Sequence, residues 1–390
     1  MKIDKSNPLH WFCLVLFSIN IVLAVLIRKF VSSNGNVLLY GHKLNGNLAA
    51  IYRESKRYRE LNLSYLTMDY FYYRKLRREG VSVVWAGSPL ALKLLITARV
   101  LISDHGLHSL VLLLDHSSLK FIDVWHGIPF KGFDESDFRV QHRYDEVWVT
   151  SNFIADMYEN KFGFERDKLK PIGYARTDIL INTKEVDKNA LMRAYNIPAS
   201  NRKVVLYAAT WKQDDSSRSQ YPFNMGEAEF LTELSHLAET HNCIFLIRAH
   251  LNATATSMEK IDNVFSVPAA CYPDTERLLL LCDLLIYDWS SIAFDYLLLG
   301  KAAIYLDVSP PFKKGFSLDG SYRYGDRASD FNELRRGVAK NIGSGAESIA
   351  LTRGCRERIL GLVYESFADG AASARACDNL VENYIRHNHE

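Results

Sequence analysis

The chain has 390 residues, a length sufficient for two domains of ordinary size, and 48% of them are hydrophobic. This length and composition exclude a disordered chain and a small disulfide-stapled domain. Its 47 Lys and Arg nearly balance 45 Asp and Glu, which argues against a general nucleic-acid binder and makes any polyanion site local. The six cysteines form no CxxC pair and no Cys/His metal spacing, so we expect reduced thiols in a cytosolic compartment.

An apolar run near the N-terminus extends from Trp11 to Ile27 and is broken only by Ser18 and Asn20. As a helix it would be about 26 Å long, which barely spans a bilayer core. We therefore predict a membrane anchor helix within residues 1–34. A signal peptide and a buried N-terminal helix are the alternatives. More basic residues follow the run than precede it, which favours a cytoplasmic location for the rest of the chain.

Short β-rich runs then alternate with amphipathic stretches, a pattern typical of a parallel sheet covered by helices. We expect these runs to form a first α/β domain over residues 35–185. The predicted strands are Val37–Tyr40, Leu63–Thr67, Val81–Trp85, Leu110–Leu114, Phe121–Val124 and Glu146–Thr150.

A turn-prone, charged region from Asn182 to Lys203 precedes a second alternating series, which we assign to a domain over residues 186–390. Two such halves predict a cleft between domains. The stretch from Ala328 to His387 is predicted to be mostly helical. The predicted strands are Val204–Ala208, Ile244–Arg248, Val264–Val267, Leu284–Tyr287 and Ala303–Leu306, with helices at Glu227–Thr240, Thr275–Cys282 and Ile292–Leu299.

The motif WHGIPFKG places His126 directly after the predicted strand 121–124. Ligands of open α/β sheets collect where buried strands end, so this imidazole is placed for chemistry. A hydrogen bond to a neighbouring loop is the alternative role of the ring. One histidine alone does not establish a functional site, so the case for His126 depends on the other motifs of the chain.

Two further strands deliver polar residues to their carboxyl ends. Thr210 and Lys212 follow strand 204–208 and could meet a phosphate or a ribose. Arg248, the last residue of the predicted strand 244–248, and His250 lie two residues apart, so both could face one way in extended backbone. Arginine binds phosphate oxygens in a fork and histidine moves protons near neutral pH. Each pair could also be an ordinary solvated strand end.

Ser290 and Ser291 follow strand 284–287 and precede the apolar helix 292–299. Either serine would cap that helix, and a helix N-terminus with free N–H groups binds a phosphate anion. Arg176, in the turn GYARTD that closes the first half, could reach an anion across the cleft. A surface pair of Arg176 with Asp178 is the alternative.

Taken together and in this order, five motifs resemble those of the CDP-glycerol glycerophosphotransferase family, the primases and polymerases of teichoic acids and related capsules. The resemblance covers residues 36–310, and Gly46-Asn47 also resembles the start of the family's opening helix. The chain departs from the family's usual residues at five positions. It has Ala175, Ala209 and Leu251 where the family usually has Pro, and it has Ile128 and Phe130 where the family usually has Thr and Leu. The five motifs are WHGIPFKG, GYARTD, LYAATWK, RAH and DLLIYDWSSIAFDYLLLGKAAIY.

The resemblance implies a glycosyltransferase B fold of two Rossmann-like domains, with the acceptor on the N-terminal side and the nucleotide donor on the C-terminal side. It implies transfer of glycerol phosphate or ribitol phosphate from CDP-glycerol or CDP-ribitol to a hydroxyl of a lipid-linked saccharide or polyol phosphate, with release of CMP. This activity would be placed at the cytoplasmic face of the bacterial membrane, and no nucleic acid would be bound.

By the same resemblance His126 and His250 are the catalytic histidines. Ser290 and Ser291 form the donor phosphate site, with Arg176 as a further phosphate contact. We add Thr210, Lys212 and Arg248 as donor-binding candidates. No cofactor or metal ligand is predicted, and the need for a divalent ion stays open. A metal site at Asp104, His105, His108 and Asp115-His116 is weakly indicated, since the spacing is not that of a zinc site.

Two other functions fit the same fold. One is a glycosyltransferase that moves a sugar from a nucleotide sugar, and the other is a membrane-tethered nucleotide-binding scaffold without turnover. The aromatic cluster Tyr70, Tyr72 and Tyr73 beside the basic stretch 74–78 predicts a helix with an interfacial or solvated face. A direct role of that helix in holding a lipid-linked acceptor is the alternative.

Overall fold

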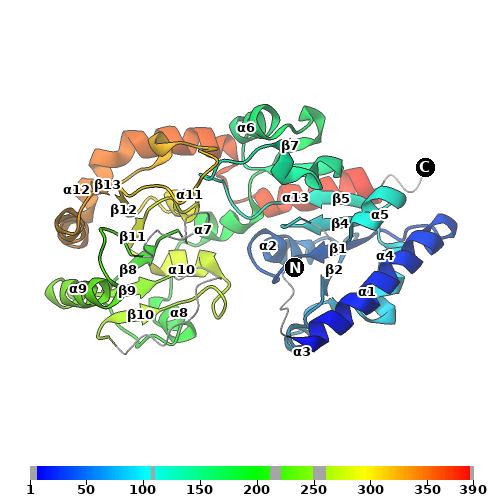
Figure 1. Ribbon diagram of the computed structural model, residues 1–390, viewed down its shortest axis with the longest axis horizontal. Coiled ribbons are helices and arrows are strands. Elements are labelled where there is room, and N and C mark those ends of the chain that lie inside the picture. Colours follow the sequence, from blue (N-terminus) through cyan, green and yellow to red (C-terminus); the bar gives the residue numbers. More distant parts are fainter. Residues whose placement is uncertain (1–6, 107–109, 211–220, 249–260, 387–390) are drawn as a thin grey trace. The chain divides into compact units, whose positions relative to one another are not determined.

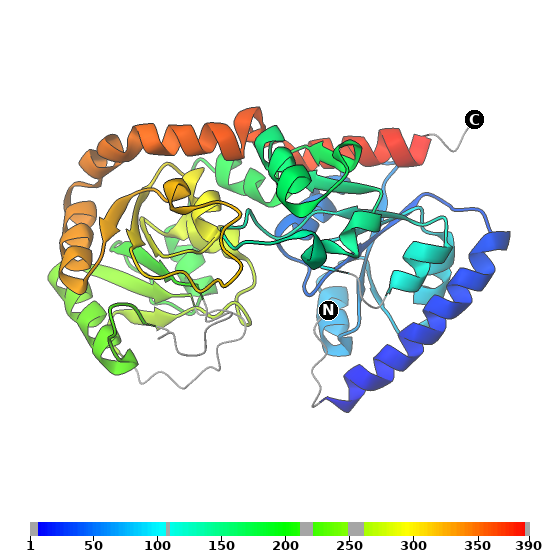
Figure 2. The ribbon, with the colours of Figure 1, turned by 45° about the horizontal axis from the view of Figure 1, so that its top comes forward.

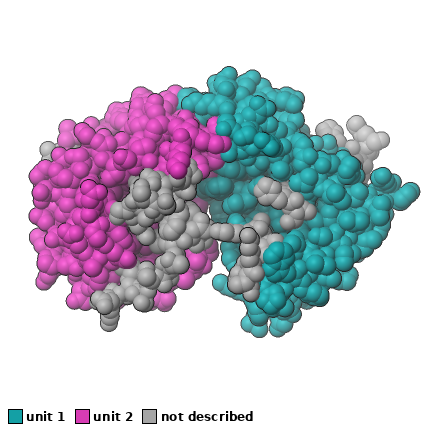
Figure 3. All heavy atoms as spheres, viewed as in Figure 1, with its two compact units in different colours: residues 1–126, 134–178, 369–390 teal, residues 127–133, 179–368 magenta. Residues whose placement is uncertain are grey.

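The computed structural model describes residues 7–106, 110–210, 221–248 and 261–386. The chain forms two compact units, coloured separately in Figure 3. Unit 1 comprises residues 1–126, 134–178 and 369–390, and unit 2 comprises residues 127–133 and 179–368. The division differs from the boundary that we expected, because the last residues pack with the first unit and a short loop after His126 packs with the second.

Unit 1 is built on a parallel sheet whose described strands follow the order β3-β2-β1-β4-β5-β6-β7 (Figure 1). Side chains of β1 alternate between two cores, with Val37 and Leu39 on one face and Leu38 and Tyr40 on the other. Burial on both faces explains the continuous apolar runs. The strands are β1 (Asn36–Tyr40), β2 (Asn62–Thr67), β3 (Val83–Trp85), β4 (Val100–Ser103), β5 (Lys120–Asp123), β6 (Glu146–Val149) and β7 (Leu169–Pro171).

Helices cover both faces of this sheet and begin at the capping residues that the sequence supplies. Asp69, Ser88 and Ser151 each accept a backbone N–H in the first turn of the helix that follows. The helices are α1 (Pro8–Ile27), α2 (Gly46–Ser55), α3 (Tyr70–Arg78), α4 (Pro89–Thr97), α5 (Val111–His116), α6 (Asn152–Phe162) and α13 (Ala372–Leu380).

One predicted strand of unit 1 is wrong. Residues 110–114 were expected to be extended, but residues 111–116 form α5. Leu110 and Leu113 are buried whereas Leu112 is exposed, which is the spacing of a helix face. The strand at this point of the sheet is β4, which we missed because its apolar residues continue the apolar run of α4.

The apolar helix α1 lies along α4 and α5 on the surface of unit 1 (Figures 1 and 2). Phe17 and Ala24 are fully buried in the core on that face of the sheet. Asn20 Nδ2 donates to the carbonyl of Ala86 at 2.9 Å, and Arg28 Nη1 donates to the carbonyl of Leu95 at 2.7 Å. By length and composition, residues 8–30 would also suffice to cross a membrane.

Unit 2 contains a second parallel sheet, whose described strands have the order β10-β9-β8-β11-β12-β13. Its predicted strands and the helix at 227–240 match the structure closely, and α12 runs along β12 and β13 (Figure 2). The elements are α7 (Asp178–Asn182), α8 (Lys188–Ala194), β8 (Lys203–Ala208), α9 (Glu227–Thr240), β9 (Cys243–Ile247), β10 (Val264–Ser266), α10 (Thr275–Leu281), β11 (Leu284–Tyr287), α11 (Ile292–Leu297), β12 (Ala302–Leu306), β13 (Asp326–Ala328) and α12 (Phe331–Val363).

The C-terminal segment belongs to unit 1 because of Asp178. Its carboxylate accepts the backbone N–H groups of Ala372 at 3.0 Å and Ser373 at 2.7 Å, and also the Ser373 hydroxyl. These bonds satisfy N–H groups in the first turn of α13, which packs against α2. A single buried carboxylate therefore ties the end of the chain to the first unit.

Candidate active site

The loop that carries His126 is held in a strained conformation by Asn47. Trp125 has a φ of +36°, which is unfavourable for a bulky side chain. Asn47, buried at the start of α2, donates its amide to the carbonyls of Val124 at 2.8 Å and Trp125 at 3.0 Å. Such strain persists only where neighbouring groups fix the backbone, which is common at functional sites.

Arg176 completes this arrangement from the GYARTD turn. Its backbone N–H donates to Asn47 Oδ1 at 3.0 Å, and its Nη1 donates to the carbonyl of His126 at 2.5 Å. Three segments far apart in the sequence thus meet at Asn47. The sequence predicted Arg176 as a phosphate contact; in unit 1 the structure places its guanidinium against the backbone of the histidine loop.

The imidazole of His126 has a defined tautomer. Its Nδ1 lies 3.1 Å from the backbone carbonyl of Asp104, which can only accept, so Nδ1 carries the proton and Nε2 is the basic nitrogen. The residue as a whole is exposed to solvent. Desolvation by the surrounding protein atoms lowers the pKa of His126 below 6.5, more than Asp104 raises it, and a positive charge on His105, when that ring is protonated, would lower it further. The ring is therefore a neutral base near pH 7.

The sequence named His105 and Asp104 only as part of a disfavoured metal site, not as catalytic or donor-binding residues. His105 Nδ1 lies 2.7 Å from Asp104 Oδ1, and its ring stacks on that of His126 with centroids 4.7 Å apart. His42 meets His105 edge-on at 4.9 Å. The three histidines follow β1, β4 and β5, which are neighbours in the sheet. Their positions after strands were the available signal, but β4 had not been recognised.

Asp123, at the end of β5, is a buried carboxyl group beneath this cluster. It is 1% exposed, and in the described part of the chain no side chain donates a hydrogen bond to either oxygen, while the backbone N–H of Trp125 is the polar group that favours its charged form. Burial and the negative charge of Asp104 raise the pKa of Asp123 well above 3.8. The protonated form is therefore favoured, since an isolated charge would be costly there.

In unit 2, Asp288 connects two of the predicted motifs. Its Oδ1 accepts the backbone N–H of Thr210 at 2.8 Å and the Thr210 hydroxyl at 2.6 Å. Asp288 is 1% exposed and also accepts the N–H of Trp289. The Thr210 side chain therefore joins the ends of β8 and β11, and its contact with a ligand stays a prediction.

Ser290 and Ser291 are half-buried at the start of α11. Ser291 is the residue before the first helical turn, as predicted, but its side chain forms no capping hydrogen bond. The carbonyls of Ser290 and Ser291 instead accept the N–H groups of Ala293 and Phe294. The hydroxyls are thus not committed to the cap of this short helix.

Arg248 follows β9 but binds protein oxygens. Its Nη1 donates to the carbonyls of Val267 at 3.1 Å and Tyr272 at 2.6 Å, and its Nη2 donates to the Thr275 hydroxyl at 2.9 Å. Burial lowers the pKa of Arg248. The guanidinium therefore holds the loop before α10. Lys212 and His250, the remaining predicted residues, lie outside the described residues.

The second half of the WHGIPFKG motif packs on the serine-bearing turn of unit 2. Phe130 stacks on Phe294 with ring centroids 4.7 Å apart and meets Trp289 edge-on at 6.0 Å. Gly132 approaches residues 314–315 so closely that a Cβ would lie 2.5 Å from the carbonyl oxygen of Lys314. Two of the predicted motifs are therefore neighbours inside unit 2.

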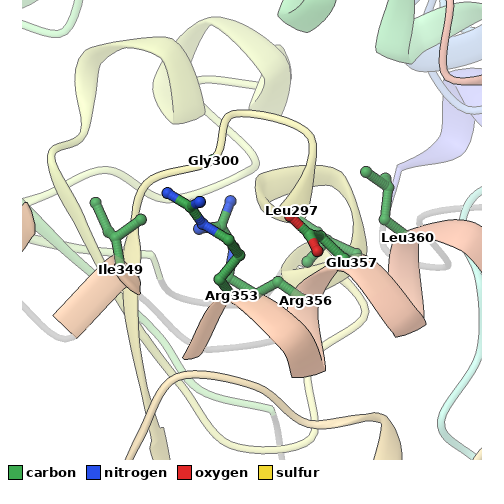
Figure 4. Close-up of a pocket in the computed structure, with 7 residues that line it drawn as sticks. All are labelled: Leu297, Gly300, Ile349, Arg353, Arg356, Glu357 and Leu360. Atoms are coloured by element: carbon green, nitrogen blue, oxygen red, sulfur yellow. The ribbon is translucent and has the colours of Figure 1, made fainter. Parts of the chain in front are cut away.

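Two other features were tested as sites. In the described ranges, no group of three or more His, Cys, Asp and Glu side chains is placed to hold a metal ion. A pocket lined by Leu297, Gly300, Arg353, Arg356 and Glu357 lies between α12 and the C-terminal end of α11, with both arginines side by side (Figure 4). It is at the opposite end of α11 from the two serines, so it is separate from the predicted donor site.

Two parallel α/β units with polar groups at strand ends define a fold of the glycosyltransferase B-like class. The family model for CDP-Glycerol:Poly(glycerophosphate) glycerophosphotransferase matches residues 24–382. The chain belongs to this family, and the resemblance recognised in its motifs is confirmed. It is therefore a phosphotransferase.

Relatives and solved structures agree with this assignment. The chain is 26% identical over 293 residues to a teichoic acid glycerol-phosphate transferase of Staphylococcus aureus, covering 67% of this chain and 71% of the relative. It is 24% identical to a teichoic acid poly(ribitol-phosphate) polymerase of Bacillus spizizenii, covering 90% of this chain but 56% of the relative.

The wall teichoic acid polymerase TagF has the same fold. Its structure superposes with a TM-score of 0.76 at 20% identity, covering 98% of this chain and 97% of that one. UDP-GlcNAc 2-epimerase from Neisseria meningitidis superposes with a TM-score of 0.53 at 13% identity, covering 89% of this chain and 100% of the epimerase. The predicted glycosyltransferase B-like fold is confirmed.

Proposed function

We propose that this protein transfers glycerol phosphate or ribitol phosphate from a CDP-activated donor to a hydroxyl of a membrane-linked acceptor in the synthesis of a cell-wall or capsule polymer. Family membership supports the reaction class, and the relatives act in teichoic acid synthesis. The observation that carries the proposal is the fixed tautomer of His126, whose Nε2 is left as a neutral base.

In the proposed reaction, an acceptor hydroxyl attacks the phosphorus that carries the polyol. A new O–P bond forms, the bond from phosphorus to the CMP oxygen breaks, and CMP leaves with the bonding electrons. The proton of the attacking hydroxyl passes to His126 Nε2. General-base assistance of this kind is worth about 10² to 10⁴ in rate. Asn47 and Arg176 keep the ring in place through the loop backbone.

The donor is assigned to unit 2. Ser290 and Ser291 are proposed to bind the donor phosphates, since their hydroxyls are not used by the helix cap. His250 is proposed as a charge-stabilising group by family resemblance alone. Lys212 is proposed as a phosphate contact because it follows the end of β8 in the sequence. Thr210 and Arg248 are proposed to position the strand ends around the donor, because their side chains are bound to Asp288 and to the 267–275 loop. Electrostatic stabilisation of the pyrophosphate would loosen the bond to CMP.

A donor screen tests this function. The purified full chain is incubated with a lipid-linked acceptor and, in turn, CDP-glycerol, CDP-ribitol, a UDP-sugar and a GDP-sugar. Release of CMP together with a product heavier by one polyol phosphate is expected with a CDP-polyol. Transfer from a nucleotide sugar instead would establish the sugar-transferase alternative. Binding of CDP-glycerol with neither CMP nor product would establish a scaffold.

We further propose that the protein works at the cytoplasmic face of the membrane, with α1 lying in the plane of the interface. One face of α1 is packed on unit 1, and the opposite face exposes a row of large apolar side chains. Spanning the bilayer would strip Asn20 and Arg28 of their partners and place an arginine in the hydrocarbon, which is costly. The exposed side chains are Leu9, Trp11, Phe12, Val15, Ile19, Val22, Leu23, Leu26 and Ile27.

A further inference from the structure

Two imidazoles of unit 1 are anchored on one residue. His126 Nδ1 lies 3.1 Å from the backbone oxygen of Asp104, and His105 Nδ1 lies 2.7 Å from its carboxylate. The rings are nearly parallel, with an interplanar angle of 7° and centroids 4.7 Å apart. In both rings, therefore, Nδ1 is held by Asp104, and Nε2 is the nitrogen that Asp104 does not bind. In the described part of the chain neither Nε2 has a hydrogen-bond partner.

The support of this pair is rigid. The Asp104 side chain is 8% exposed, and the backbone of Gly41 lies so close that a Cβ there would be 2.5 Å from Asp104 Oδ1. His42 closes the other side of His105 with an edge-on contact. By contrast, the His105 side chain is 35% exposed. A ring oriented by a buried carboxylate and open to solvent at the end of a sheet is placed to meet a ligand.

His105 cannot relay the proton of His126. Imidazole N–H groups and lone pairs lie in the ring plane, so two parallel stacked rings do not hydrogen-bond to each other. Any chemical role of His105 must therefore be exercised on the substrate directly, beside the atom that reacts at His126.

We propose that His105 determines acceptor specificity by binding the hydroxyl next to the one that reacts. The inference rests on the proposed function and names its acceptor class, a polyol end that carries two hydroxyls on adjacent carbons. The attacking hydroxyl gives its proton to His126 Nε2. The neighbouring hydroxyl keeps its proton and donates a hydrogen bond to His105 Nε2. The two stacked rings thus offer two parallel acceptors to two adjacent O–H groups.

This arrangement predicts rejection of an acceptor that lacks the second hydroxyl. A site built to bind a hydroxyl leaves a polar atom unpaired when the analogue arrives. The loss corresponds to about 1 to 3 kcal/mol, or about 5- to 150-fold in kcat/KM. Donor binding in unit 2 is unaffected by the change.

The test compares two synthetic acceptors with CDP-glycerol as donor. One is an alkyl phosphate ester of glycerol with its vicinal diol free, and the other is the 3-hydroxypropyl ester, which keeps the primary hydroxyl and lacks the secondary one. The wild-type chain should prefer the diol by about 5- to 150-fold in kcat/KM. His105→Phe keeps an aromatic ring on His126 and removes both nitrogens, so the two acceptors should then react within about threefold of each other.

His236→Phe, on the exposed side of α9, is the matched control and should keep the wild-type ratio. Slow release of CMP to water without acceptor reports whether His105→Phe retains a working donor site. The inference is overturned if His105→Phe keeps the preference for the diol, or if the wild-type chain has no such preference. The comparison of the two acceptors with the wild-type chain needs no variant, so it tests the inference even if His105→Phe fails to fold. Absence of CMP release with every acceptor would instead overturn the proposed function.

Discussion

The side-chain amide of Asn47 donates to the backbone carbonyl of Trp125 at 3.0 Å and thereby holds Trp125 at a φ of +36°. The same amide binds the Val124 carbonyl, and its oxygen accepts the N–H of Arg176. Asn47 uses three of its hydrogen-bonding positions on two separate loops. The orientation of His126, the next residue, therefore depends on an asparagine that touches no titratable group.

Asn47→Ala should lower kcat much more than it raises KM for the donor. Loss of both carbonyl partners relaxes the strained loop, and misplacement of a base by about 1 Å costs about 10² in rate. We also expect a loss of about 1 to 3 kcal/mol in the free energy of unfolding, because buried carbonyls are left unpaired. Rates of CMP release and urea unfolding measure the two effects.

Asn62→Ala is the control, since Asn62 is an exposed residue of β2 bonded only to Asn36 among described residues. It should leave both kcat and stability near wild-type values. A kcat of Asn47→Ala within twofold of wild type would show that the loop keeps its conformation without the amide.

Gly41→Ala should disturb the histidine pair without changing any polar group. The new Cβ would lie 2.5 Å from Asp104 Oδ1 and 2.7 Å from Leu48 Cδ1, so the carboxylate must move. We expect a fall of about tenfold or more in kcat, because Asp104 anchors both rings. Gly361→Ala, inside α12 with open space around its Cα, is the control and should stabilise the protein slightly. Equal activity of the two variants would refute the anchoring role of Asp104.

The acid limb of the pH profile, which is the range in which activity falls as the pH is lowered, should lie below pH 6.5. His126 acts in its neutral form, which exists above its pKa, and desolvation lowers that pKa below 6.5. Activity is therefore retained as the pH falls past 6.5 and lost as it falls through the lowered pKa. The profile of kcat/KM from about pH 8 to about pH 4 measures this.

Asp104→Asn should move this acid limb to lower pH, because the Asp104 charge raises the pKa of His126. Asp115→Asn, which removes a surface carboxylate paired with Arg143, should leave the limb in place. An acid limb at or above pH 6.5 in the wild-type chain, or a shift to higher pH in Asp104→Asn, would contradict the assignment of His126 as the base.

The sequence predicted the strand ends well, but it did not predict which protein groups the side chains at those ends bind. Runs such as 204–208 and 284–287 are buried on both faces, so their apolar pattern identifies them directly. Thr210 and Arg248 were correctly placed after strands, but their side chains bind Asp288 and the 267–275 loop. Which partner a polar side chain chooses depends on residues about 20 to 80 positions away, and no local pattern contains that information.

The pairing of His105 with His126 and the packing of the end of the chain on unit 1 were not predicted, for related reasons. β4 and α4 form one apolar run in the sequence, so the strand before Asp104 was not separated from the helix. Residues 369–390 were assigned to the second domain by position in the chain. The carboxylate of Asp178 instead binds the start of α13 and attaches it to unit 1. Both features are set by tertiary contacts.

The surface around α1 combines apolar and basic side chains within unit 1. Phe12, Val15 and Ile19 are 57%, 58% and 50% exposed on the outer face of the helix. The start of α3 is close by, because Trp85 packs in the same core as α1 and meets Tyr70 at 5.5 Å. On α3 a groove is lined by Tyr70, Phe71, Arg74, Lys75, Arg78 and Glu79, so three of its six lining residues are basic and one is acidic. Aromatic and basic side chains together suit an anionic lipid interface.

Val15→Asp combined with Ile19→Asp should weaken binding to vesicles that contain phosphatidylglycerol by about 10-fold or more, because two apolar contacts of about 1.5 kcal/mol each are lost. The control Leu351→Asp changes a side chain that is 71% exposed on α12 and should bind as the wild type does. Sedimentation with vesicles measures the affinity. An in-plane helix also predicts release of the wild-type protein by alkaline carbonate, since the hydrocarbon core is not crossed. Retention after carbonate would show that α1 leaves unit 1 and spans the bilayer.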